Sequence, residues 1–131
     1  MILYNGALVT KDSVCISHED RGYYFGDGVY EVFRIYNGKL YEKQAHLARL
    51  ERSSREIKLQ LNYTLTQIDE MLEQLRLSEN VSEGTLYLQI TRGIAARSHT
   101  FPQHSSPTLL AYITPVDRPL QTRRNGINAI S

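Results

Sequence analysis

Two of the three Asn-Gly dipeptides restrict the fold of this chain more than any other feature, because each lies between short stretches of β-forming residues. Asparagine and glycine accept the positive φ angles of the tight turns that join antiparallel strands. Asn5-Gly6 and Asn37-Gly38 therefore predict two hairpins, and the second is clearer because its first strand is rich in β-branched and aromatic residues. The predicted strands are residues 2–4 with 7–9, and residues 29–36 with 39–41.

A change of hydrophobic spacing near residue 42 predicts two amphipathic helices. Apolar and small side chains then recur every three or four positions, which is the spacing of one helix face, so we expect a helix over about residues 43–58. A second helix is expected to follow, with Thr66 and Asp69 as its capping box and an end near residues 79–80.

Alternating apolar and polar residues return in two further segments, residues 85–91 and 108–114. Both are predicted to be strands, and the polar residues 93–107 between them are predicted to be a loop. The expected fold class is therefore α+β, an antiparallel β-sheet with two packed helices. Residues 127–131 are expected to begin a new strand, so the chain end is interpreted as a truncation.

Composition argues against several classes of protein. The 131 residues, 41% of them hydrophobic, suffice for one core, and a net charge of +1 gives no broad attraction to nucleic acid or to an anionic membrane. Neither a signal peptide nor a membrane-length apolar run is found, so a cytoplasmic protein is expected. The single cysteine, Cys15, cannot form an internal disulfide and is interpreted as a buried small side chain. The histidines share no ligand spacing with it, so no metal site is predicted.

Individual residues also suggest chemistry before any family is considered. Arg97 and His99, two residues apart in the polar loop, could hold a small carboxylate, although such a loop more commonly only faces solvent. Tyr30 follows a glycine-rich turn that could aim it into a cleft, with packing in the core as the alternative. Arg49 lies on the first predicted helix, where ion pairs with helix neighbours are the default.

Four motifs, spread over nearly the whole chain, resemble successive signatures of the class IV aminotransferases. They are Arg21-Gly22-Tyr23, Phe25-Gly26-Asp27-Gly28-Val29-Tyr30-Glu31, His46-Leu47-x-Arg49-Leu50 and Gln89-Ile90-Thr91-Arg92-Gly93. The first two are shared with branched-chain aminotransferases and aminodeoxychorismate lyases. A further stretch discriminates better, because residues 97–102 resemble the Arg-x-His-x-Phe-Pro sequence of D-amino-acid aminotransferases, the D-alanine enzymes above all.

The resemblance implies a homodimeric enzyme that uses pyridoxal 5'-phosphate to pass the amino group of D-alanine or another D-amino acid to a 2-oxo acid. By this resemblance, Arg49 contacts the cofactor phosphate, a role that suits a fixed planar cation. Tyr30 lines the substrate site. Arg97 and His99 complete a trap for the α-carboxylate of the substrate, reached across the dimer interface.

The family's catalytic lysine, which forms a Schiff base with the cofactor, has no match in this sequence. The resemblance locates that lysine in a larger domain, past residue 131. Residues 1–118 are therefore interpreted as the small, substrate-side domain, and residues 119–131 as a linker and the start of the larger one. No catalytic residue is assigned, and the chain alone is expected to be inactive and without cofactor. The four lysines lie in predicted turns or on polar helix faces: Lys11, Lys39, Lys43 and Lys58.

Two alternatives stay open. The parent protein could be a branched-chain aminotransferase or an aminodeoxychorismate lyase of the same fold, against which the pair Arg97 and His99 argues. The chain could also be a non-catalytic binding or dimerisation domain, and the missing lysine is the support for that interpretation.

Overall fold

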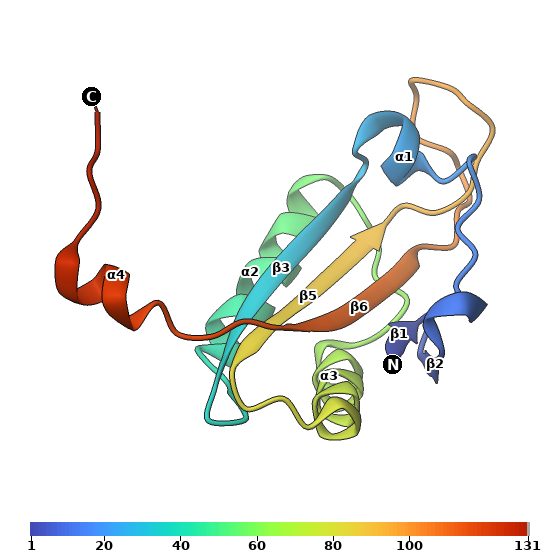
Figure 1. Ribbon diagram of the computed structural model, residues 1–131. Helices are drawn as coiled ribbons and strands as arrows, with labels where there is room; N and C mark the ends of the chain where they lie inside the picture. The colour runs from blue at the N-terminus through green and yellow to red at the C-terminus, as the bar shows by residue number, and fades with distance from the viewer. Residues whose placement is uncertain (131) are drawn as a thin grey trace.

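Six strands within residues 1–130, the part of the chain that the computed structural model describes, form one antiparallel sheet in the order β2-β1-β6-β5-β3-β4 (Figure 1). The strands are β1 (Ile2–Tyr4), β2 (Ala7–Val9), β3 (Gly28–Tyr36), β4 (Lys39–Leu40), β5 (Gly84–Thr91) and β6 (Thr108–Pro115). The helices are the 3-10 turn η1 (Lys11–Ser13), α1 (Arg21–Phe25), α2 (Lys43–Glu56), α3 (Leu65–Glu79) and α4 (Leu120–Asn125). The predicted α+β class is confirmed.

Both predicted hairpins form around their Asn-Gly turns. β1 pairs with β2 across Asn5-Gly6, and β3 pairs with β4 across Asn37-Gly38. All four turn residues have positive φ angles, between 46° and 87°, as a tight primed turn requires. The second hairpin is shorter than predicted, since β4 ends at Leu40.

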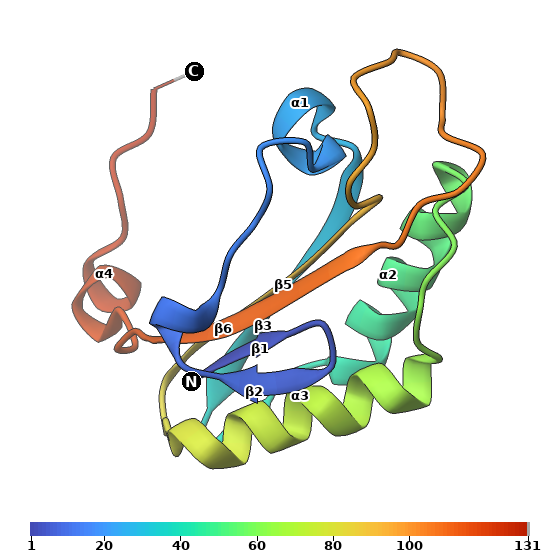
Figure 2. The ribbon, with the colours of Figure 1, turned by 90° about the vertical axis from the view of Figure 1, so that its right-hand side faces the viewer.

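The hydrophobic core lies on one face of the sheet. α2 packs on β3, and α3 packs on β1 and β6, so the two long helices cover the same side (Figure 2). Full burial of a leucine or isoleucine stabilises the folded chain by about 2 kcal/mol relative to exposure. The largest fully buried hydrophobic side chains are Leu3, Phe33, Ile35, Leu50, Ile68, Leu72, Leu75, Leu86, Leu88 and Leu109. The opposite face of β3, β5 and β6 points away from both helices, and we call it the uncovered face.

The capping box of α3 differs from the prediction. Thr64 is the N-cap, its Oγ1 accepts a hydrogen bond from the Gln67 backbone at 3.2 Å, and Gln67 Oε1 accepts one from the Thr64 backbone at 2.9 Å. The predicted pair, Thr66 and Asp69, was wrong because the helix begins earlier and Asp69 faces Lys43 of α2 instead, with an N–O distance of 2.6 Å.

Two other expectations about local structure also fail. Cys15 is exposed, because it lies in an unpaired segment between η1 and α1. Residues 127–130 form no strand, since no neighbouring strand receives their backbone hydrogen bonds, and Ser131 lies outside the described residues. The helix α4, which precedes them, buries no side chain and stands apart from the sheet (Figure 1).

Replacing Gly93 with alanine is expected to destabilise the chain more than the same change at Gly38. Both glycines have positive φ angles, 85° and 72°, so both variants carry backbone strain of about 1–2 kcal/mol. A Cβ atom at Gly93 would also overlap the carbonyl of Ser106, whereas nothing lies near a Cβ atom at Gly38. Urea unfolding of the two variants measures the difference. Equal losses would show that the loop backbone at Ser106 moves aside without cost.

Candidate functional site

The helix α1 is fixed at both ends by its own sequence. Asp20 caps its start, with Oδ1 accepting from the Gly22 backbone at 2.8 Å, while Oδ2 accepts from the Thr91 hydroxyl at 2.9 Å. Gly26 ends the helix in the left-handed conformation, with φ of 61°. These contacts hold α1 beside the junction where β3 begins and β5 ends.

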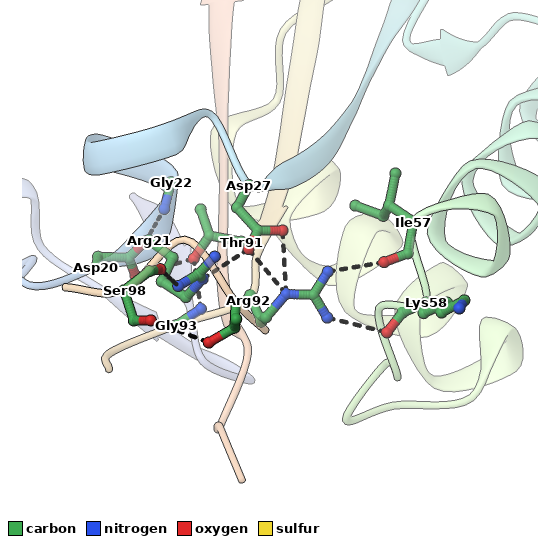
Figure 3. A network of polar contacts seen from close by, with 11 residues as sticks. Asp20, Arg21, Gly22, Asp27, Ile57, Lys58, Thr91, Arg92, Gly93 and Ser98 are labelled. Carbon is green, nitrogen blue, oxygen red and sulfur yellow. Dashed lines mark hydrogen bonds and ion pairs between the residues drawn. The ribbon is translucent and has the colours of Figure 1, made fainter. Parts of the chain in front are cut away.

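A buried network of Arg21, Asp27 and Arg92 holds this junction together (Figure 3). Asp27 Oδ2 accepts hydrogen bonds from Arg21 Nε at 2.7 Å and from Arg92 Nε at 2.9 Å. All three side chains are nearly buried, with exposed fractions of 3% for Arg21, 7% for Asp27 and 6% for Arg92. Burial raises the pKa of the Asp27 carboxyl, but the hydrogen bonds and charges of the two arginines outweigh it and hold that pKa below its ordinary value.

The same two arginines, Arg21 and Arg92, also donate hydrogen bonds to backbone carbonyls of distant segments. Arg92 donates through Nη1 and Nη2 to the carbonyls of Lys58 and Ile57 at 2.9 and 2.8 Å, just beyond the end of α2, where a cation is favoured. Arg21 Nη1 donates to the carbonyl of Ser98 at 2.7 Å. The network therefore joins α1, α2, β5 and the loop over residues 93–107. It was not predicted, although all three side chains lie within the recognised motifs.

Arg97 and His99 lie on either side of Ser98 in that loop, and both are exposed. The Arg97 guanidinium is 5.6 Å from the centre of the Phe25 ring in α1. The centre of the His99 ring is 5.4 Å from the centre of the same Phe25 ring. Within residues 1–130 no carboxylate pairs with Arg97, so its N–H groups are available to donate hydrogen bonds to an anionic ligand.

Tyr30 lies on the uncovered face of the sheet, with 63% of its surface exposed, so the alternative of core packing is wrong. It alternates with the buried residues Val29 and Glu31 along β3. Its ring stacks on Tyr87 of β5 with 6.0 Å between centres, and Tyr87 lies 5.4 Å from Tyr112 of β6. Burial and the neighbouring tyrosines raise the pKa of Tyr87 above its ordinary value.

Arg49 pairs with a buried carboxylate from β3, and not with its helix neighbours as the default interpretation expected. Glu31 is 1% exposed, and its two oxygens accept from Arg49 Nε at 2.7 Å and Nη2 at 2.6 Å. His46 Nδ1 lies 2.7 Å from Glu31 Oε2, and its ring packs on Phe33. The hydrogen bond and charge of Glu31 raise the pKa of Arg49. Burial raises the pKa of Glu31, but Arg49 and His46 outweigh it and lower that pKa.

The four predicted site residues therefore form two groups. β4 pairs with β3 only at Ile35 and Tyr36, so the edge of β3 near its start is free of a neighbouring strand. Arg49 is bound to Glu31 in this stretch of β3, and Tyr30 is the residue before Glu31 in the same strand. Within residues 1–130 no hydrogen bond or ring contact joins this group to Arg97 or His99.

Arg49 has the right chemistry for a phosphate, whereas Lys43 does not suit covalent attachment of a cofactor. Arg49 is a guanidinium fixed by Glu31 with 53% of its side chain exposed, so donors remain free for a ligand. Burial lowers the pKa of Lys43, but Asp69 and Glu73 outweigh it and raise that pKa. An amine that stays protonated is a poor nucleophile.

The surface away from these groups carries a separate hollow. A cavity of about 640 Å³ is lined by residues of the first hairpin, η1, α3 and β6, and by none of the predicted site residues. In residues 1–130, no three potential metal ligands come together. No helix in that part of the chain has the length and apolar character needed to cross a membrane.

Comparison with known proteins gives a consistent set of matches. The family model for amino-transferase class IV matches residues 28–130. The D-alanine aminotransferase of Staphylococcus epidermidis is 41% identical over 131 residues, which cover 99% of this chain and 46% of that protein. The chain thus spans about half the length of the curated relatives it matches.

Solved structures share the fold. A hypothetical aminotransferase from Mycobacterium tuberculosis, in its PLP-bound form, superposes with a TM-score of 0.78 at 26% identity, over 96% of this chain and 43% of that one. The branched-chain amino acid aminotransferase of Escherichia coli superposes with a TM-score of 0.83 at 17% identity, over 91% and 40% of the two chains, and this likeness concerns the fold alone.

Proposed function

The chain belongs to the class IV aminotransferases, and from this premise we propose that its parent protein transfers the amino group of D-alanine or another D-amino acid to a 2-oxo acid. The observation that carries the proposal is the pair Arg97 and His99, exposed on a loop that a buried arginine anchors between them. Together they offer a cationic fork and an imidazole to one α-carboxylate. The 41% identity to a D-alanine aminotransferase supports this substrate class.

In this proposal residues 1–118 are the small, substrate-side domain, and residues 119–131 are a linker and the start of a larger domain. Tyr30 lines the substrate site from the uncovered face. Arg97 and His99 act on the site of a partner protomer in a homodimer. The lack of contact between the two groups within residues 1–130 supports that division, because a shared site needs each protomer to present its groups outward.

Pyridoxal 5'-phosphate, when bound, supplies an electrophilic carbon for the amino group and a conjugated ring that accepts electron density from the substrate Cα. Arg49 contributes a fixed cation for its phosphate, and Glu31 holds that cation in place. Arg97 and His99 fix the carboxylate and thereby the direction of the Cα–H bond. The group that moves the proton comes from outside these 131 residues.

The test is an assay of the parent protein, extended through the second domain, beside the 131-residue chain. With D-alanine and 2-oxoglutarate, the extended protein is expected to form pyruvate and glutamate, and the short chain is expected to form none. L-Alanine and L-leucine are the matched controls. Turnover confined to L-leucine would favour a branched-chain aminotransferase, and formation of pyruvate from a chorismate derivative would favour the lyase. Pyruvate from the short chain would contradict the assignment of the lysine beyond it.

A further inference from the structure

We propose that Arg21 is a positioning residue for the substrate carboxylate. It fixes the backbone between Arg97 and His99, the two residues that bind this carboxylate. The inference rests on the proposed function of Arg97 and His99. Arg21 itself is 2% exposed and lies under the loop, so it does not touch the substrate. Its guanidinium is joined to the loop by one hydrogen bond, to the carbonyl of Ser98.

The loop has few other attachments near its functional residues. In the described chain, the bond from Arg21 Nη1 to the Ser98 carbonyl is the one hydrogen bond that ties residues 96–106 to the rest of the molecule. The remaining attachment is through rings, with the Phe101 ring 4.0 Å from the Arg92 guanidinium. Residues 96–101 are exposed and have no regular secondary structure. Without Arg21, Arg97 and His99 would sample many arrangements at a cost in binding entropy.

The geometry requires an arginine at position 21. Its Nε is bound to Asp27 at 2.7 Å while Nη1 is bound to Ser98 at 2.7 Å, so one planar group makes two directed contacts at once. The Phe25 ring lies 4.7 Å from the same guanidinium and covers one of its faces. A lysine keeps the charge but has a single terminal nitrogen, and so cannot reproduce this fork. Arg21→Lys therefore tests whether the positive charge is sufficient or whether the two directed hydrogen bonds of the guanidinium are needed.

Trypsin provides a direct measurement of the anchor, because Arg97 is a cleavage site and Ser98 follows it. In the folded parent protein, Arg21→Lys is expected to raise the rate of cleavage after Arg97 about tenfold, as measured by mass spectrometry of the released peptides. Arg92→Lys is the matched control, since it perturbs the same Asp27 pair and the contact with the Phe101 ring but leaves the bond to Ser98 intact. Equal rates for the wild type and Arg21→Lys, or for the two variants, would overturn the proposal. If Arg21→Lys does not fold, Arg21→Gln replaces it.

Steady-state kinetics of the same variants measure the effect on the substrate. Arg21→Lys is expected to raise KM for D-alanine about ten- to a hundredfold with a smaller change in kcat, because misplacing binding groups by about 1 Å has effects of this size. Arg92→Lys is expected to raise KM less. An unchanged KM beside faster cleavage would refute the positioning role. A wild-type protein that does not turn over D-alanine would instead refute the proposed function, and the cleavage rates would still decide whether Arg21 anchors the loop.

Discussion

Replacement of Asp27 with asparagine is expected to lower the free energy of unfolding of the chain by about 3–5 kcal/mol. The change leaves the guanidinium groups of Arg21 and Arg92 buried without the carboxylate that they share. Urea unfolding followed by circular dichroism at pH 7 measures the loss. Asp12→Asn is the control, because Asp12 is exposed and its replacement should alter stability by less than about 0.5 kcal/mol. A loss below about 1 kcal/mol for Asp27→Asn would show that the network relaxes or admits water.

The same network gives the chain a defined pH dependence. The pKa of Asp27 is lowered on folding, so its ionised form stabilises the fold fully above the unfolded pKa of about 4. That contribution is lost as the pH falls from about 4 through the lower, folded pKa. The difference in stability between the wild type and Asp27→Asn should therefore narrow below about pH 4, because a protonated Asp27 resembles asparagine. A difference that stays constant from about pH 7 to about pH 3 would argue against the charge as its cause.

Arg97→Ala in the extended parent protein is expected to lower kcat/KM for D-alanine about ten- to a hundredfold. Loss of a hydrogen bond to a charged group costs about 1.5–3 kcal/mol, and each 1.4 kcal/mol is about tenfold in rate. The folded chain should keep its stability, because Arg97 is exposed and pairs with no carboxylate in residues 1–130. Arg55→Ala, on the exposed side of α2, is the matched control and should leave the kinetics unchanged. A change of less than about twofold for Arg97→Ala would refute the carboxylate trap and favour the alternative enzymes.

Features that depend on neighbouring residues were predicted well from the sequence. The Asn-Gly turns, the two-residue alternation of β3 and β5, and the three-to-four spacing of α2 each express a local rule. The capping box was misassigned because the two pairs have the same spacing. The helix begins at Leu65, so Thr64 and Gln67 form the box, and Asp69 contacts Lys43 instead.

Features that join distant segments could not be predicted. Asp27 meets Arg92 only because β3 and β5 pair with Gly28 opposite Thr91, a register that no local pattern fixes. Alternation along β3 accounts for the burial of Glu31, but its partner on α2 depends on how that helix packs. The residue types of the site came from motifs, and their separation into two groups became visible only in the folded chain.

The free edge of β3 has a consequence for solubility. An unpaired strand edge exposes backbone donors and acceptors that can recruit a strand from another molecule, and natural sheets commonly guard such edges with charge. Here Glu31, in the part of β3 that has no neighbouring strand on this side, holds the Arg49 guanidinium. The residue that we assign to the cofactor phosphate is thus also a charge bound to a strand with a free edge. Variants that remove its charge will need to be compared as soluble, monodisperse protein before any loss of activity is attributed to the cofactor.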